Sequence, residues 1–172
     1  MPVVWGGAKI NLLKYKDQAD SFIARFKSLN FESAVYTDVE ELIRESDIVV
    51  SCVTAADTLI CPNDDCFGEG ILVVPVHTPG FQNCDLFFDK VFGDDTGHVR
   101  GFKYFDKFKQ YDEFANVLSG NNPGRENDDE RILAYNVGIS LHDIYFASKI
   151  YNLLKDKTEK IDLGGKLEKF WI

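Results

Sequence analysis

The sequence predicts an α/β fold in which a mostly parallel β-sheet is flanked by helices. Short apolar runs of strand length alternate along the chain with segments of helical periodicity. Two of these runs, Asp47–Val53 and Ile71–Val76, are apolar almost throughout, which is typical of parallel strands covered on both faces. The hydrophobic content of 45% and the charged content of 27% lie in the globular range. Strands that alternate with helices form parallel sheets with right-handed crossovers.

The first part of the chain predicts two strands, each followed by a helix. Lys9–Tyr15 is rich in Ile and Leu and forms the first strand. Asp17 is placed as the N-cap of a helix that runs to Leu29. Ser33–Tyr36 forms the second strand, and Thr37 caps a helix whose acidic first turn suits the positive end of the helix dipole.

The middle of the chain adds the two apolar strands, a third one and an aromatic segment. Pro75 places a break or a sheet edge near the end of its strand, because proline cannot donate to a β-ladder. Lys90–Phe92 is the third apolar strand. Phe102–Leu118 has a helical tendency and carries aromatic side chains available for burial, and Ser119–Asp129 is a loop rich in turn residues.

The C-terminal part predicts a strand–turn–helix unit followed by a tail. Arg131–Asn136 forms a short strand, Gly138 breaks it, and Ile139–Leu154 carries apolar residues at helical spacing. One domain is expected over residues 1–157. The tail, residues 158–172, ends in apolar side chains and is expected to dock on the domain or on a partner.

The charge balance excludes some partners. A net charge of −9 argues against a general affinity for nucleic acid or anionic membranes, since phosphate attraction needs a basic surface. The sequence has no apolar run of the roughly 18 residues that a membrane helix needs, and its N-terminus lacks the pattern of a signal peptide. A soluble, cytoplasmic protein is therefore expected.

Four cysteines raise the question of a metal site: Cys52, Cys61, Cys66 and Cys84. Cys61 and Cys66 are separated by four residues, a spacing that some zinc sites use. The other two lie in apolar, strand-like surroundings, and no second close pair completes a tetrahedral set. Free thiols of a reducing compartment are the favoured interpretation, and no metal is expected.

Candidate ligand-binding residues follow from the sheet, because doubly wound sheets bind ligands at the carboxyl ends of their strands. The residues at these ends are Lys14, Tyr15, Asp17, Val53, Thr54 and Gly138. In a dinucleotide-binding domain, the loop after the second strand contacts the adenosine ribose. In such a loop Lys14 or Lys16 could pair with a 2′-phosphate of the ribose, and Asp17 could accept hydrogen bonds from its hydroxyls. The alternative, a helix N-cap flanked by solvated lysines, stays open.

His77 offers the clearest acid–base chemistry. It follows the Ile71–Val76 strand, and histidine exchanges protons near neutral pH. The alternative is a hydrogen-bonded loop histidine without a catalytic role. His98 follows Asp94 and Asp95 and is expected to pair with these carboxylates structurally.

The segment Gly124–Tyr151, GRENDDERILAYNVGISLHDIYFASKIY, resembles the late signature of the ornithine cyclodeaminase/μ-crystallin family. Asp47–Val53 is similar to the family's "ADIVVTAT" strand, and His77-Thr78-Pro79-Gly80 stands where the family has Asp-x-Pro-Gly. The resemblance extends from about Ile10 to Tyr151. It implies an incomplete Rossmann-like fold, an NAD or NADP cofactor, and conversion of ornithine to proline or related amino- or imino-acid chemistry.

The resemblance also implies that parts are missing. The family's glycine-rich phosphate loop and its substrate-binding half have no counterpart in this sequence, and His77 replaces the catalytic aspartate. The first Rossmann strand is absent too. Four explanations stay open: Val3–Trp5 fills part of the gap, the sheet closes up, a second chain supplies the pairing, or the chain is a fragment of a longer gene product. A homodimer or a separate N-terminal-half polypeptide is therefore expected.

Three hypotheses follow for function. The chain is a truncated relative that is inactive alone, or half of a split enzyme that uses His77 as acid or base. The third hypothesis is a non-catalytic interaction module whose aromatic surface, Phe102–Phe108, binds a protein partner.

Overall fold

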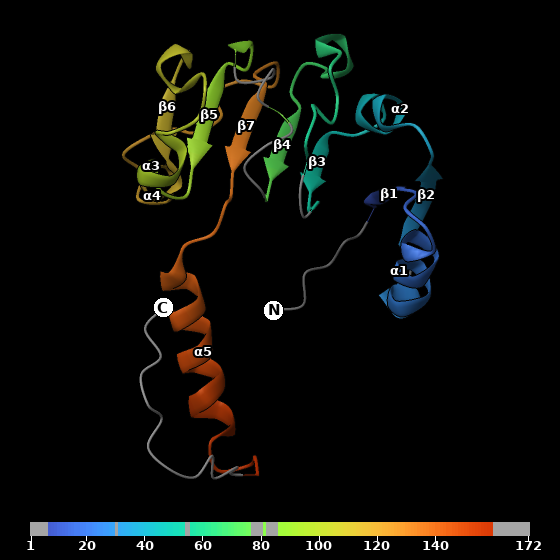
Figure 1. The fold of residues 1–172 in the computed structure, drawn as a ribbon, viewed down its shortest axis with the longest axis vertical. Coiled ribbons are helices and arrows are strands. Elements are labelled where there is room, and N and C mark those ends of the chain that lie inside the picture. Colours follow the sequence, from blue (N-terminus) through green and yellow to red (C-terminus); the bar gives the residue numbers. More distant parts are fainter. Residues whose placement is uncertain (1–6, 30, 54–55, 77–80, 82–85, 160–172) are drawn as a thin grey trace. The chain divides into compact units, whose positions relative to one another are not determined.

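The computed structural model describes residues 7–29, 31–53, 56–76, 81 and 86–159 (Figure 1). The chain divides into two compact units, residues 1–138 and 139–172. The first unit contains every strand that the structure describes, and the second contains the long helix α5. The expected tail begins at residue 158, and because residues 160–172 lie outside the described part, its docking stays a prediction.

All the described strands pair in parallel, which confirms the predicted fold class. β1 (Lys9–Leu13) pairs with β2 (Glu32–Tyr36) in a two-stranded sheet. The second sheet has five strands in the order β3-β4-β7-β5-β6. These are β3 (Ile48–Ser51), β4 (Leu72–Pro75), β5 (Lys90–Gly93), β6 (Tyr111–Glu113) and β7 (Ile132–Tyr135). In Figure 1 the last of them, β7, lies between β4 and β5.

The helices are short except at the C-terminus. They are α1 (Gln18–Phe26), α2 (Val39–Arg44), α3 (Thr96–Val99), α4 (Phe114–Leu118) and α5 (Ser140–Leu154). Single 3₁₀ turns cover Lys27–Leu29, Asp64–Cys66 (η2) and Phe105–Lys107.

Local caps differ from the predicted ones. Asp38, rather than Thr37, is the N-cap of α2, and its Oδ1 accepts hydrogen bonds from the amides of Glu40 at 2.7 Å and Glu41 at 3.1 Å. Asp17 does occupy the N-cap position of α1, but its side chain makes no capping hydrogen bond.

The aromatic segment 102–118 does not form the predicted helix. It contains a 3₁₀ turn, strand β6 and helix α4, because Tyr111–Glu113 pairs with β5 and the β-ladder overrides local helical tendency. Phe102, Phe105 and Phe108 pack against the core, with the ring of Phe102 4.7 Å from that of Tyr135. These three rings of the surface proposed for a protein partner are thus partly buried against the chain's own core, and the binding role of that surface stays a prediction. Leu118, expected to be available for burial, is 88% exposed.

The core lies mainly under the central strands of the five-stranded sheet. β5 and β7 are buried along their whole length. β3 is covered on one face only: Val49 and Ser51 are buried, whereas Ile48 and Val50 are 61% and 58% exposed. The expectation that this apolar strand is covered on both faces is therefore wrong for the described residues.

The two sheets are not joined by a ladder within the described ranges, and the predicted absence of a first Rossmann strand stays a prediction. β1 pairs only with β2 and β3 only with β4, and within the described ranges no ladder joins β1 to β3. Val3–Trp5, one candidate for the missing strand, lies outside the described residues. Pro75 is the last residue of β4, where a missing N–H does least harm to the ladder.

Helix α5 confirms the predicted helix but not the packing that its periodicity suggests. None of its residues is buried, including Ile144, Ile150, Tyr151 and Leu154 of the predicted apolar face. No described helix is long and apolar enough to cross a bilayer.

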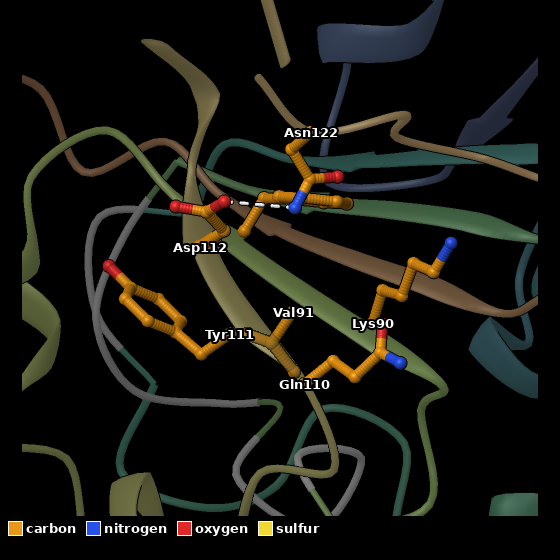
Figure 2. A pocket seen from close by; sticks show the side chains of 7 residues that line it. Lys90, Val91, Gln110, Tyr111, Asp112 and Asn122 are labelled. Atoms are coloured by element: carbon orange, nitrogen blue, oxygen red, sulfur yellow. Dashed lines mark hydrogen bonds between the residues drawn. The ribbon is translucent and has the colours of Figure 1, made fainter. Parts of the chain in front are cut away.

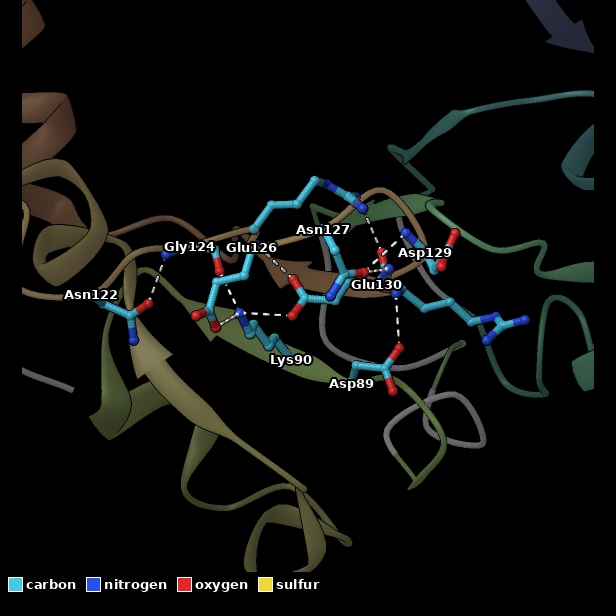
Figure 3. A network of polar contacts seen from close by, with 10 residues as sticks. Asp89, Lys90, Asn122, Gly124, Glu126, Asn127, Asp129 and Glu130 are labelled. Atoms are coloured by element: carbon cyan, nitrogen blue, oxygen red, sulfur yellow. Dashed lines mark hydrogen bonds and ion pairs between the residues drawn. The ribbon is translucent and has the colours of Figure 1, made fainter.

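A buried lysine anchors the amino edge of the five-stranded sheet (Figure 3). The ammonium of Lys90, whose side chain is 5% exposed, donates to the carbonyl of Gly124 at 2.6 Å. It also forms ion pairs with Glu126 at 2.6 Å and Glu130 at 3.0 Å. Asp89 accepts a hydrogen bond from the Arg131 amide at 3.0 Å, which fixes the start of β7 beside β5.

The pKa shifts in this network define the pH range over which it stabilises the fold. Burial lowers the pKa of Lys90, but its hydrogen bonds to Glu126 and Glu130 and their charges outweigh burial and raise it. The backbone hydrogen bond from Glu126 and the charge of Lys90 lower the pKa of Glu130. Lys90 therefore stabilises the fold below the ordinary lysine pKa and Glu130 above the ordinary glutamate pKa, a window of about pH 5 to 10.

Replacing Lys90 by methionine should lower the free energy of unfolding by about 3–5 kcal/mol, because the change removes one partner of a buried ion pair. Lys109→Met is the matched control: Lys109 also pairs with a carboxylate and donates to a carbonyl, but its side chain is 50% exposed. That control should cost at most about 1 kcal/mol. Urea denaturation measures both, and equal losses would contradict the role of burial.

Candidate functional site

The candidate site is the carboxyl edge of the five-stranded sheet, where all five parallel strands end. Val53 lies just beyond β3 and is 41% exposed. Gly138 lies just beyond β7 and is also exposed. Thr54 and His77 lie outside the described residues, so the acid–base role of His77 stays a prediction.

Lys14, Tyr15 and Asp17 lie together in the exposed turn between β1 and α1. The amide of Lys14 extends the ladder to the carbonyl of Tyr36 at 2.7 Å, and Lys16 adopts a left-handed conformation with φ of 52°. Within the described part of the chain, no hydrogen bond or ion pair engages the ammonium of Lys14 or the carboxylate of Asp17. Both charged groups are therefore open to solvent or ligand, which fits the ribose prediction and the solvated-lysine alternative equally.

Asp94, immediately after β5, ties the candidate edge together. Its Oδ2 accepts a hydrogen bond from the amide of Gly138, which has a φ of +93° suited to glycine. Its backbone amide donates to the carbonyl of Tyr135 at 3.2 Å. Its other carboxylate oxygen, Oδ1, is buried and has no hydrogen-bond partner among the described residues. A buried acceptor without a donor is costly, so this oxygen is suited to a donor supplied from outside.

Sequence reasoning missed this role of Asp94. The sequence predicted that the carboxylates of Asp94 and Asp95 pair with His98. The His98 ring is exposed on α3 and makes no polar contact in the described structure. The useful signal was position: Asp94 is the first polar residue after a buried strand, on the edge where parallel sheets bind ligands.

A second polar group lies at the ends of β5 and β6. Glu113 accepts hydrogen bonds from the amide of Thr96 at 2.8 Å and from the Thr96 hydroxyl, and the Tyr111 hydroxyl donates to Thr96 Oγ1 at 3.4 Å. Burial raises the pKa of Tyr111, so this phenol remains a hydrogen-bond donor at neutral pH. Gly93 permits the arrangement, because a Cβ there would stand 2.7 Å from the Tyr111 hydroxyl.

Two cavities lined by described residues lie away from this edge. Figure 2 shows the first, about 20 Å³ between β5 and β6 beside Asp112 and Asn122, which is room for a single water. The second, about 280 Å³, lies at the amino ends of β3 and β4 and includes Ile48, Leu72 and Arg125. Neither includes a residue that follows a strand's carboxyl end, so neither supports the predicted cofactor site.

Comparison with known proteins places these features in one family. The model of the Ornithine cyclodeaminase/mu-crystallin family matches residues 8–158. The Nodulation efficiency protein NfeD of Rhizobium meliloti is 25% identical over 171 residues, covering 95% of this chain and 52% of the relative. A Delta(1)-pyrroline-2-carboxylate reductase of Bacillus cereus is 26% identical over 150 residues, covering 78% of this chain and 44% of the relative.

A solved structure shares the fold. The Delta(1)-pyrroline-2-carboxylate reductase of Thermococcus litoralis, in complex with NADH and L-proline, gives a TM-score of 0.71 at 19% identity, covering 86% of this chain and 50% of that one. The likeness confirms the Rossmann-like prediction. The chain spans about half the length of the curated relatives it matches.

Replacing Asp94 by alanine should free the connection between β7 and α5, because the Gly138 amide loses a charge-assisted acceptor worth about 1.5–3 kcal/mol. We expect hydrogen exchange of a peptide covering residues 136–139 to accelerate about tenfold or more, measured by mass spectrometry. Asp95→Ala is the control, since the Asp95 side chain makes no hydrogen bond to this connection in the described structure. Unchanged protection in Asp94→Ala would contradict the assignment.

Proposed function

Because this chain belongs to the ornithine cyclodeaminase/mu-crystallin family, whose model matches residues 8–158, we propose that it is the nicotinamide-dinucleotide-binding half of a family enzyme. The reaction is amino- or imino-acid chemistry of the family's kind, and the chain by itself is not active. The observation that carries the proposal is the carboxyl edge of the parallel sheet. There Asp94 accepts a hydrogen bond from Gly138, and its other, buried carboxylate oxygen has no donor among the described residues.

The residues after the strands fit part of a dinucleotide. Lys14, Tyr15 and Asp17, which follow β1 of the two-stranded sheet, would contact the adenosine ribose. Val53, Thr54 and Gly138 would contact the rest of the dinucleotide. Asp94 Oδ1 would accept a hydrogen bond from a hydroxyl or amide of the ligand. When bound, the nicotinamide would supply or accept the hydride. The described residues contain no glycine-rich turn that lets a pyrophosphate approach a helix N-terminus, which supports inactivity of the chain alone.

The substrate proposed is a small cyclic imino acid or the amino acid related to it. Two relatives support this class: the Bacillus cereus protein and the Thermococcus litoralis structure are both named Delta(1)-pyrroline-2-carboxylate reductases. Deaminating cyclisation of ornithine is the alternative within the family. In either reaction His77 would be the acid or base, provided that the remaining half is supplied.

A protein partner is proposed from two uncovered apolar surfaces. One is the face of β3 that carries Ile48 and Val50, each more than half exposed. The other is α5, on which eight large apolar side chains are exposed: Leu141, Ile144, Tyr145, Phe146, Ile150, Tyr151, Leu153 and Leu154. Exposed apolar surface of this extent marks an interaction site. The partner is a second copy of the chain or a separate polypeptide that carries the family's other half.

Millimolar NAD(H) or NADP(H) should raise the thermal stability of the protein, by about 2.7 kcal/mol where the nucleotide reaches a hundredfold excess over Kd. Asp94→Ala should reduce the shift with every nucleotide. Lys14→Ala should reduce the shift with NADPH more than with NADH if its ammonium pairs with the 2′-phosphate. Absence of any shift, alone or with the partner present, would contradict dinucleotide binding.

Light scattering coupled to size-exclusion chromatography should give a mass of twice 19.5 kDa, or that of a complex with a separate half. Ile144→Asp should weaken the assembly, because burying an isoleucine contributes about 1.5–3 kcal/mol. Asn152→Asp is the matched control, since it adds the same charge to α5 at a polar position. A clean monomer of the wild-type chain would exclude the homodimer and leave the separate polypeptide to be tested by co-purification.

A further inference from the structure

Three side chains with metal-binding atoms meet where α2 packs against the η2 turn: Glu40, Cys61 and Cys66. The two Sγ atoms and a carboxylate oxygen of Glu40 lie within 4.8 Å of one another. Glu40 belongs to the first turn of α2, and Cys66 ends the 3₁₀ turn. The sequence alone did not point to this set, because Glu40 lies far from the cysteines along the chain and only the packing of α2 against η2 brings it to them.

The surrounding hydrogen bonds hold the three side chains in place. Asn63 Oδ1 accepts a hydrogen bond from the Asp65 amide at 3.2 Å, which shapes the turn. Asn63 Nδ2 donates to Glu40 Oε2 at 3.3 Å, and the Cys61 thiol donates to the Asn63 carbonyl at 3.4 Å. One asparagine thus connects the turn, the first thiol and the carboxylate.

The three side chains differ in burial, and one of them is a carboxylate. Cys61 and Cys66 are 0% and 1% exposed, whereas the Glu40 side chain is 37% exposed and faces solvent. Arg44 contacts the Glu40 carboxylate at 3.5 Å. Among the described residues, Arg44 is the one basic group that contacts any of these three side chains.

We propose that Glu40, Cys61 and Cys66 bind one zinc ion. Thiolate ligands select zinc or copper(I) over magnesium and calcium, and two sulfurs with one carboxylate oxygen suit zinc. Zinc forms bonds of about 2.0–2.3 Å to such ligands, so a small inward movement of the three side chains would close the site. The fourth position lies on the exposed side beside Glu40, where water or an external donor completes the tetrahedron.

Binding would exchange protons for metal: each thiol releases its proton as its sulfur bonds to zinc, and the metal is neither oxidised nor reduced. The ion would join α2 to the connection between β3 and β4. Since Leu42 and Ile43 of α2 belong to the core, the site would stabilise the packing of that helix. This inference is independent of the proposed dinucleotide site.

The test is titration of the full chain, after reduction and chelation, with Co²⁺ and then Zn²⁺. We expect one Co²⁺ per chain with a thiolate-to-cobalt charge-transfer band, lost when Zn²⁺ displaces it, and protons released on binding. Cys66→Ser should abolish the band. Glu40→Gln changes a partly exposed side chain and should preserve the fold. It should weaken the affinity for the metal about tenfold or more, because even the loss of a group that only hydrogen-bonds to a metal ligand has an effect of this size.

Cys52→Ser is the control, because Cys52 is exposed and outside the cluster. It should bind the metal as the wild type does. Absence of the charge-transfer band in the wild-type chain, or equal metal binding by Cys66→Ser, would overturn the proposal. A Cys61–Cys66 disulfide that forms in air despite excess Zn²⁺ would overturn it as well, and would identify the pair as redox-active.

Discussion

The contacts of the buried Lys90 ammonium are the interactions on which the pairing of β5 and β7 depends. A charge removed from water is expensive unless hydrogen bonds and opposite charges surround it. Here a backbone carbonyl and two glutamates do so, all supplied by the loop 124–130 that leads into β7. In the same loop, the Arg125 guanidinium donates a hydrogen bond to the Gly70 carbonyl at 2.9 Å, close to the start of β4. The loop therefore holds β7 between its two neighbours.

This arrangement explains what the family signature does in the molecule. The acidic stretch that begins it pairs with Lys90 at the amino edge of the sheet, and its end places Gly138 at the carboxyl edge against Asp94. Only the second contact lies where a parallel sheet binds ligands. The signature thus contributes largely to folding, and only its last few positions before α5 lie at the edge where our proposal places the ligand.

Two exposed apolar surfaces relate the fold to the proposed partner. One face of β3 and the whole of α5 carry apolar side chains without cover in the described structure, and the chain spans about half of its curated relatives. Parallel strands are usually covered on both faces, whereas β3 is covered on one face only. Partner binding and catalytic competence are therefore coupled in our proposal: the surface that needs cover belongs to the fold that would bind the cofactor.

Local pattern was sufficient to predict most of the described strands and helices, because alternation, apolar runs and glycine breaks act over a few residues. β3, β4, β5, β7 and α5 were placed from such signals, and the residues of the signature predicted the family. The rest needed the tertiary structure. Pairing with β5 turned Tyr111–Glu113 into a strand, and packing left β3 covered on one face. The packing of α2 brought Glu40 to two cysteines, and the end of β5 brought Asp94 to Gly138. These contacts join residues 20 or more positions apart, and local periodicity carries no information about which distant segments will meet.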